Sequence, residues 1–267
     1  MIHLTDVTFS YPSQTNPTIN NLSISFEASS YTLIAGPDGS GKTTLAKLIK
    51  GSIEPDLGNV TIEANRLLEI GYVGGDPSEF LVGITVEDEM VFGLENIGTP
   101  SSTIRNRLEH ALSWTGLSGM ENRLTHSLSG GEQQRLALAG LLAMGCRVFI
   151  FDDAFSMLDR TTRYAIRSVI EKLRKEFGVT IIEVNNNIQR ILGTDRIVFL
   201  SNGSILFDGS PWNFLRNEIG LRWARSSGGI GHLAAELHQF GLLNKTLDQT
   251  KGLQEGLLED LLMRLRP

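Results

Sequence analysis

The chain has 267 residues, 41% of them hydrophobic and 20% charged, which is enough for one large packed domain and a smaller appendage. Its net charge is −6 and it has no long basic run, which argues against a nucleic-acid-binding protein. The single cysteine, Cys146, excludes a disulfide framework, and we expect neither a signal peptide nor direct insertion into a membrane.

The N-terminal segment predicts two β-strands, over residues 2–9 and 20–26, where apolar and polar residues alternate. Tyr11 follows the first strand. An aromatic ring placed upstream of a phosphate loop can stack on a purine base. Taken alone, a tyrosine at a strand end is more often half-buried packing, so both interpretations stay open at this point.

Residues 31–51 read as a short apolar strand, a glycine-rich loop and a helix that stops at Gly51. The loop matches the phosphate-loop pattern Gly-x4-Gly-Lys-Thr, and its residues run Gly36, Pro37, Asp38, Gly39, Ser40, Gly41, Lys42, Thr43, Thr44. Glycines let successive backbone N–H groups face an anion, and the start of the helix adds its positive dipole end. We therefore expect Lys42 to reach the phosphates of a nucleotide and the Thr43 hydroxyl to ligate Mg²⁺. A chance Gly/Ser loop is the alternative, and the strand–loop–helix context disfavours it.

The middle of the chain predicts strands over residues 59–63 and 69–73, and a loop over 74–77. It also predicts helices over residues 86–94 and from a cap at Ser101 or Ser102 to about residue 114. Residues 128–135 read Leu-Ser-Gly-Gly-Glu-Gln-Gln-Arg, so Ser129, Gly130 and Gly131 open another helix whose N–H groups can face an anion.

An apolar run over residues 148–151 ends in two acids, Asp152 and Asp153, and describes a buried parallel strand with carboxylates at its C-terminal edge. In a phosphate-loop protein the first of these, Asp152, is the expected Mg²⁺-side carboxylate. A helix over residues 160–176 follows, and then a buried strand over 179–184 that ends at Asn185.

The remaining segments predict a β-hairpin of residues 196–200 and 205–207, a short helix over 211–216 and a Gly/Ser break at 226–229. Amphipathic helices are expected at 231–240 and 253–266. They either cap the domain or contribute to dimer contact.

These motifs, in this order, resemble the nucleotide-binding subunits of ABC transporters over residues 2–214. Residues 82–96 and 230–262 are similar to the ATPases of energy-coupling factor (ECF) transporters, which import vitamins and metal ions. The resemblance implies an α/β fold of the ABC type of P-loop NTPase. It has a RecA-like core sheet, an N-terminal antiparallel β-subdomain and a helical subdomain at about residues 76–145. The ATPase domain would span residues 1–220, and a C-terminal helical region residues 221–267.

The resemblance also implies a mechanism. Two such domains bind head-to-tail and hold two ATP molecules with Mg²⁺, on the cytoplasmic face of a membrane beside an integral membrane transporter subunit. Tyr11 matches the aromatic residue that stacks on adenine, and Ser129 and Gly131 match residues that contact the γ-phosphate bound by the partner. Residues 156–159 match the loop that crosses the dimer interface.

Three segments depart from the family's pattern. Gly75 stands where the family has a glutamine that orients the attacking water, and Phe80 replaces a second glutamine nearby. Asp153 replaces the glutamate base and is one methylene shorter. Asn185 stands where the switch histidine is expected, within one residue because two more asparagines follow, and an amide cannot become cationic.

The departures predict a catalytic site, formed with Asp153 and Asn185, that binds ATP but hydrolyses it weakly. The intact Leu-Ser-Gly-Gly segment would complete an active site on a different ATPase subunit. Three alternatives stay open: a homodimeric transporter ATPase that hydrolyses ATP at both sites, a soluble ABC-type machine of DNA repair or translation, and a non-hydrolysing nucleotide-binding regulator.

Overall fold

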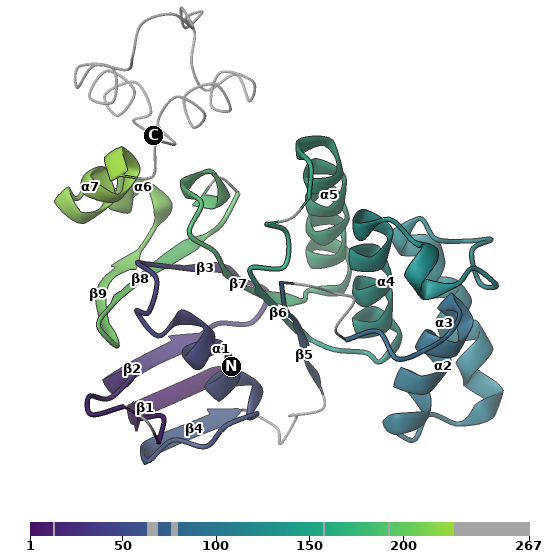
Figure 1. Ribbon diagram of the computed structural model, residues 1–267, viewed down its shortest axis with the longest axis horizontal. Helices are drawn as coiled ribbons and strands as arrows, with labels where there is room; N and C mark the ends of the chain where they lie inside the picture. The colour runs from purple at the N-terminus through teal and green to yellow at the C-terminus, as the bar shows by residue number, and fades with distance from the viewer. Residues whose placement is uncertain (13, 63–68, 76–79, 157, 192, 227–267) are drawn as a thin grey trace, which may run out of the picture.

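The computed structural model of the protein describes residues 1–12, 14–62, 69–75, 80–156, 158–191 and 193–226, and they form two sheets flanked by helices (Figure 1). A three-stranded antiparallel sheet has the order β2-β1-β4, with β1 (Ile2–Phe9), β2 (Ile19–Phe26) and β4 (Leu57–Ile62). A six-stranded sheet has the order β5-β6-β7-β3-β8-β9. Its strands are β3 (Tyr31–Ala35), β5 (Ile70–Val73), β6 (Val148–Asp152), β7 (Thr180–Val184), β8 (Arg196–Ser201) and β9 (Ser204–Gly209).

Strands β5, β6, β7, β3 and β8 pair in parallel, and only β9 runs antiparallel, against β8. Every predicted strand is therefore confirmed, with its ends shifted by at most two residues. The prediction works because the buried strands are short, apolar and β-branched, and are bounded by glycine or polar residues.

Helices cover both faces of the six-stranded sheet. Helix α1 (Lys42–Lys50) packs between the two sheets, in a core that includes Ile150 of β6. Helix α5 (Arg160–Phe177) packs on the opposite face, against Phe149 and Phe151 of the same strand. The alternation of side chains along β6 explains why one short strand is apolar at nearly every position.

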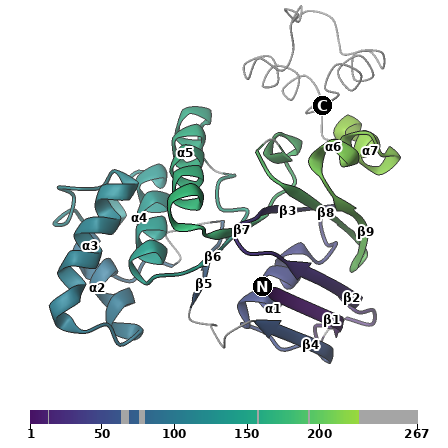
Figure 2. The same cartoon turned by 180° about the vertical axis from the view of Figure 1, so that it is seen from behind.

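Three helices form a separate core beside the sheets, as Figures 1 and 2 show from opposite sides: α2 (Val86–Asn96), α3 (Ser101–Thr115) and α4 (Gly130–Ala143). Thr85 caps α2 in a reciprocal pair with Asp88. The predicted serine cap of α3 is wrong, because Pro100 occupies the cap position without a side-chain hydrogen bond and Ser101 is already helical. Two 3-10 helices, η3 (Thr125–Ser127) and η4 (Ile188–Ile191), lie in the connecting segments.

The described chain ends in two helices, α6 (Pro211–Leu215) and α7 (Glu218–Ser226). Helix α7 was not predicted, and it runs across the domain boundary expected after residue 220. Its Trp223 ring lies 5.6 Å from the rings of both Phe199 and Phe214, so α7 packs on the six-stranded sheet through α6 and β8. The two helices predicted at residues 231–240 and 253–266 lie outside the described residues.

A tight turn links the two sheets at the phosphate loop. Asn202 and Gly203, with φ of 48° and 74°, close the predicted hairpin between β8 and β9. The Gly203 N–H donates to the Ser40 carbonyl of the loop (3.1 Å), and the Gly203 carbonyl accepts from the Asn20 N–H of β2 (3.0 Å). One residue therefore connects β2, the hairpin and the phosphate loop.

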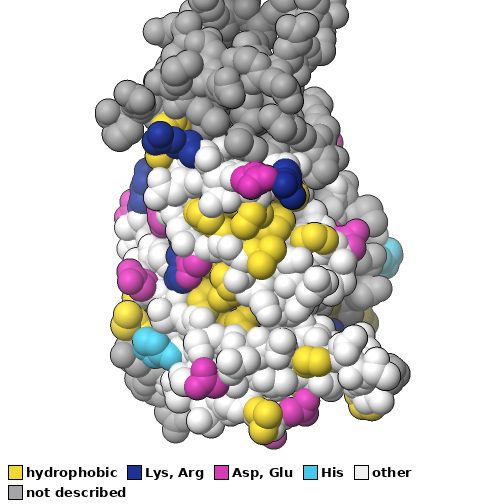
Figure 3. Space-filling view, turned by 90° about the vertical axis from the view of Figure 1, so that its left-hand side faces the viewer, with side chains coloured by type: hydrophobic (Ala, Val, Ile, Leu, Met, Phe, Trp, Pro, Cys, Tyr) yellow, Lys and Arg dark blue, Asp and Glu magenta, His cyan; other side chains and the backbone are white. Residues whose placement is uncertain are grey.

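The side of the molecule that carries β9 and β2 has hydrophobic side chains near its centre, and its basic side chains are interspersed with acidic ones (Figure 3). Leu206 of β9 is one of the large hydrophobic residues exposed at the surface. This face thus carries no continuous basic patch of the kind a nucleic-acid-binding surface needs. Within the described chain, no helix has both the length and the apolarity to cross a membrane.

Candidate nucleotide site

The phosphate loop occupies the turn between β3 and α1. Close packing leaves no room for a side chain at two of its glycines. A Cβ atom on Gly36 would lie 2.1 Å from the Leu200 carbonyl oxygen. A Cβ atom on Gly41, whose φ is 100°, would lie 2.7 Å from the Thr18 carbonyl oxygen. Helix α1 begins at the next residue, Lys42, so the N–H groups of its first turn face the loop. The geometry is that of an anion-binding turn.

The Lys42 ammonium lies over this loop. Its Nζ donates hydrogen bonds to the carbonyl oxygens of Gly36 (2.9 Å) and Pro37 (2.8 Å). Burial lowers the pKa of Lys42, and the neighbouring carboxylates of Asp38, Asp152 and Asp153 oppose that shift. The cation is therefore held where the phosphates of a nucleotide would lie.

Hydroxyl and carboxylate oxygens gather on the metal side of the loop. The Thr43 hydroxyl donates to Oδ1 of Asp152 (3.2 Å), and the Tyr72 hydroxyl donates to Oδ2 of the same carboxylate (2.6 Å). Hard oxygen donors of this kind suit Mg²⁺, so Thr43 and Asp152 fit the ion expected from the sequence. Mg²⁺ bound there would neutralise charge on the phosphates of a nucleotide.

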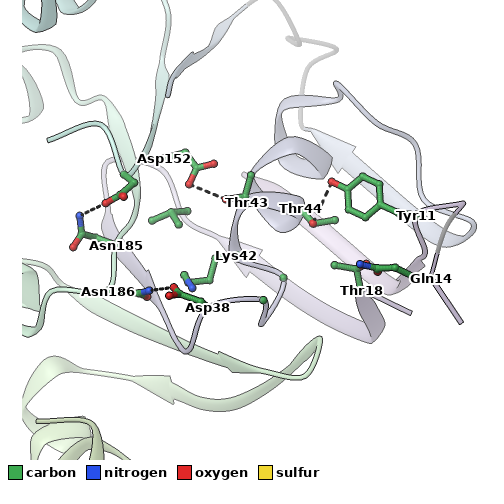
Figure 4. Close-up of a pocket in the computed structure, with 14 residues that line it drawn as sticks. Tyr11, Gln14, Thr18, Asp38, Lys42, Thr43, Thr44, Asp152, Asn185 and Asn186 are labelled. Carbon is green, nitrogen blue, oxygen red and sulfur yellow. Dashed lines mark hydrogen bonds between the residues drawn. The ribbon is translucent and has the colours of Figure 1, made fainter. Parts of the chain in front are cut away.

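The loop opens into a cavity of about 370 Å³ (Figure 4). It brings together most of the residues predicted from sequence: Tyr11, Gly39, Gly41, Lys42, Thr43, Thr44, Asp152, Asp153 and Asn185. At one end, the Tyr11 ring packs edge-on against Phe9 (5.0 Å between centroids), and its hydroxyl accepts a hydrogen bond from Thr44 (3.4 Å). Tyr11 therefore packs against its own strand and also lines the cavity, so neither interpretation of this residue is excluded.

The other end of the cavity is formed where β6 and β7 end. Asp153 has a left-handed backbone, with φ of 54°, and its Oδ1 accepts a hydrogen bond from the Asn185 amide (3.1 Å). Partial burial, together with the charges of Asp152 and Glu183, raises the pKa of Asp153. This carboxylate and amide thus bind each other across the strand ends.

Several residues of the site were not assigned a role from the sequence. Among the polar ones, Gln14, Thr18, Asp38 and Asn186 line the cavity, and Tyr72 donates a hydrogen bond to Asp152. The Asn186 amide donates to Oδ1 of Asp38 in the phosphate loop (2.6 Å), whereas Asn185 contacts Asp153 (Figure 4). The run of three asparagines was the available signal, and the structure places the second one, Asn186, against the loop.

The turn that opens α4 lies outside this cavity. The Ser129 hydroxyl accepts from the Glu132 N–H, and the Glu132 carboxylate accepts from both the N–H (2.7 Å) and the hydroxyl (2.8 Å) of Ser129. These bonds lower the pKa of Glu132. A Cβ atom on Gly131 would lie 2.3 Å from Cγ2 of Thr162, at the start of α5. Ser129, Gly130 and Gly131 therefore form a capped turn, packed against α5, that does not line the chain's own cavity.

Gly75 follows β5, beside the Asp153 backbone. A Cβ atom built on Gly75 would have the Asp153 carbonyl oxygen at 3.7 Å as its single close neighbour among the described residues beyond those adjacent in the chain. A Cβ atom would fit there, so the packing of the described residues does not require this glycine. The position expected to hold a water-orienting glutamine has no side chain.

Comparison with known proteins supports the same assignment. The family model of ABC transporters matches residues 19–156. An energy-coupling factor transporter ATP-binding protein, EcfA1 of Fusobacterium nucleatum subsp. nucleatum, is 39% identical over 228 residues, which covers 82% of this chain and 85% of that protein.

Two solved structures share the fold. The structure of cbiO1 from Clostridium perfringens, described as part of the ABC transporter complex cbiONQ, has a TM-score of 0.74 and 26% identity, with 88% of this chain and 98% of that one covered. The dimeric structure of MJ0796, a bacterial ABC transporter cassette, has a TM-score of 0.67 and 25% identity, with 79% and 99% covered. The fold class expected from the sequence is confirmed, and the chain belongs to the ABC transporter family of ATPases, which couple ATP hydrolysis to transport.

Proposed function

We propose that this chain is the ATP-binding subunit of an ECF-type membrane transporter and the partner with the weaker catalytic site in a pair of different ATPase subunits. One observation carries the asymmetry. The Asp153 carboxylate is bound to the Asn185 amide, and no side chain projects from Gly75 beside it. Among the described residues at these strand ends, Gly75 offers no group to orient water, and Asp153 is a shorter carboxylate that already accepts a hydrogen bond.

The binding half of the site supports ATP and Mg²⁺ as ligands. Lys42 lies over the phosphate loop, and Thr43 and Asp152 present oxygen atoms on its metal side. These residues hold charge and orient phosphates, but they do not activate water. The chain is therefore expected to bind Mg²⁺-ATP and to hydrolyse it slowly.

The turn of Ser129, Gly130 and Gly131 supports the second role. Its capping bonds with Glu132 are complete, and it lies away from the cavity of its own chain. A turn of this kind can serve a nucleotide held by another subunit. The named relatives support such an assembly, because cbiO1 is part of a multi-subunit complex and MJ0796 is dimeric.

The resulting subunit would bind to an integral membrane transporter subunit from the cytoplasmic face of the membrane. ATP binding and hydrolysis would drive uptake of a vitamin or a metal ion, which another subunit would recognise. The support is the similarity to EcfA1 over most of both chains.

The two halves of the proposal are separable by mutation in the assembled complex. Ser129→Arg places a large cation in the turn offered to the partner, so we expect it to abolish ATPase activity. Lys42→Ala weakens only this chain's own site, so most of the activity should remain. Steady-state phosphate release measures both, and both variants should assemble as well as the unchanged chain. Equal damage by the two substitutions would contradict the asymmetry.

A second candidate is a homodimeric ATPase that hydrolyses ATP at both sites. The raised pKa of Asp153 favours it, because a carboxyl shifted toward neutral pH is better suited to accept a proton than an ordinary aspartate. The purified chain alone distinguishes the two candidates. Rapid turnover by a self-pair would support the homodimer, whereas near-inactivity would support the asymmetric pair.

A further inference from the structure

We propose that Tyr72 is a positioning residue that orients Asp152 and so sets the Mg²⁺ affinity of the nucleotide site. The inference rests on the proposed Mg²⁺-ATP site and adds a residue that neither the phosphate loop nor the strand-end acids contain.

Strand register brings the two side chains together. Tyr72 of β5 is paired with Ile150 of β6, so Asp152 lies two residues further along β6 on the same face of the sheet. The tyrosine side chain spans that offset, and its hydroxyl donates to Oδ2 of Asp152 at 2.6 Å. A bond of this length lies in the range of roughly 2.5–2.7 Å found for hydroxyls that donate to ionised carboxylates.

Each carboxylate oxygen of Asp152 thereby accepts a hydrogen bond from a different element. Thr43 of α1 donates to Oδ1, and Tyr72 of β5 donates to Oδ2. The side chain of Asp152 is buried, with 7% of the residue exposed, so it has little freedom to rotate once both bonds form. Neither donor carries a charge, so neither adds a cation beside Asp152.

Tyr72 is the donor in this bond. A carboxylate oxygen accepts, so the proton of the bond comes from the phenol. Tyr72 is also the last side chain of β5 on this face, because Val73 packs into the core on the α5 side and Gly74 and Gly75 follow. Strand β5 thus reaches the metal side through this one hydroxyl.

The test is Tyr72→Phe, which removes a single oxygen atom and keeps the ring that packs against the α1 core. Binding of a fluorescent ATP analogue to the full-length chain would be titrated with Mg²⁺, and also measured in EDTA. We expect the Mg²⁺ concentration at half-saturation to rise about tenfold, as is typical when a residue that orients a metal ligand is lost. Affinity for the nucleotide in EDTA should stay within about twofold of the unchanged chain, since Tyr72 acts on the metal side only.

A double variant tests whether Tyr72 acts by orienting Asp152 or only by packing. In Asp152→Asn the metal-side carboxylate is gone, so adding Tyr72→Phe should change the Mg²⁺ dependence no further. An unchanged half-saturation in Tyr72→Phe, an equal loss of affinity in EDTA, or a full effect in the Asp152→Asn background would each overturn the inference while leaving the nucleotide site intact. Failure of the unchanged chain to bind the nucleotide at all would instead overturn the proposed site, and the inference with it.

Discussion

At the scale of single residues, Asp153 combines an uncommon backbone conformation with a negative charge that its surroundings disfavour. Its φ of 54° lies in the left-handed region, which aspartate and asparagine tolerate better than most side chains. Its carboxyl is partly buried beside Asp152 and Glu183, which raises its pKa. The amide of Asn185 offsets part of this cost by donating a hydrogen bond. An aspartate at this position is therefore tolerated by the backbone but destabilised by its surroundings.

The first residue-scale prediction concerns stability. A carboxyl whose pKa is raised by folding stabilises the fold below its unfolded pKa of about 4, and that contribution is lost as the pH rises through the folded value. At about pH 7 the ionised Asp153 therefore costs stability. Asp153→Asn should raise Tm by about 1–2 °C, a small value because more than a third of the residue is exposed and solvent screens its charge.

Thermal unfolding measured along a pH series provides the check. The difference in Tm between Asp153→Asn and the unchanged chain should shrink as the pH falls toward about 4, where the carboxyl becomes protonated. A difference that is independent of pH would show that the charge of Asp153 is not its cause.

The second residue-scale prediction concerns catalysis. Gly75 has room for a side chain, and Asp153 is one methylene shorter than the glutamate of the family. In the assembled complex, Ser129→Arg would silence the partner's site and leave only the turnover of this chain. Adding Gly75→Gln and Asp153→Glu to that background should raise phosphate release by about tenfold or more, because water and base regain their positions.

A matched control identifies the site responsible for that gain. Lys42→Ala in the triple variant should return the activity to the background level. Gained turnover that survives Lys42→Ala would arise elsewhere and would count against this account of the strand ends.

At the scale of elements, a buried ion pair fixes the segment that carries the asparagines. Glu183 of β7 is 1% exposed and Arg190 of η4 is 5% exposed, and the two form a salt bridge. The buried hydroxyl of Tyr31 donates to Glu183, and the Arg190 guanidinium lies 5.3 Å from the centre of the Phe155 ring. Residues 185–187 are thus held between a strand and an anchored turn, next to the loop that follows Asp153.

The element-scale prediction is that removing only one partner of the Glu183–Arg190 ion pair strongly lowers the free energy of unfolding. Arg190→Met leaves the Glu183 carboxylate buried without its cation and should destabilise the protein by about 3–5 kcal/mol. Adding Glu183→Gln removes that charge and keeps an acceptor for Tyr31, so the double variant should recover most of the loss. Chemical denaturation compares the three proteins. A double variant as unstable as Arg190→Met alone would mean that packing, rather than charge, explains the cost.

At the scale of the whole molecule, the sequence predicted the strands and most helices because their signals are local. Alternation, helical spacing, glycine stops and the Asn202-Gly203 turn each depend on neighbouring residues. Helix α7 was missed because Trp223 is stabilised by rings of Phe199 and Phe214, which come from other elements. The α3 cap was misplaced because Pro100, rather than a serine, occupies the cap position, and Ser101 is already the first helical residue.

The residues of the candidate site also fall into those that local motifs predict and those that depend on long-range contacts. Lys42, Thr43 and Asp152 were predicted because their motifs are contiguous in sequence. Asn186 and Tyr72 were not, because their roles depend on contacts with residues far along the chain: 148 positions separate Asn186 from Asp38, and 80 separate Tyr72 from Asp152. Pairing of strands sets such contacts, and a single sequence does not reveal it.

The Gly203 turn has a mechanical consequence. It is hydrogen-bonded to the phosphate loop on one side and to β2 on the other, and Gly41 is packed against the carbonyl of Thr18 at the entrance to β2. The segment between β1 and β2 also carries Tyr11. The base and the phosphates of a nucleotide would therefore contact one hydrogen-bonded body. If the proposed pairing of subunits holds, we expect any opening that frees the nucleotide to occur on the side of the partner subunit.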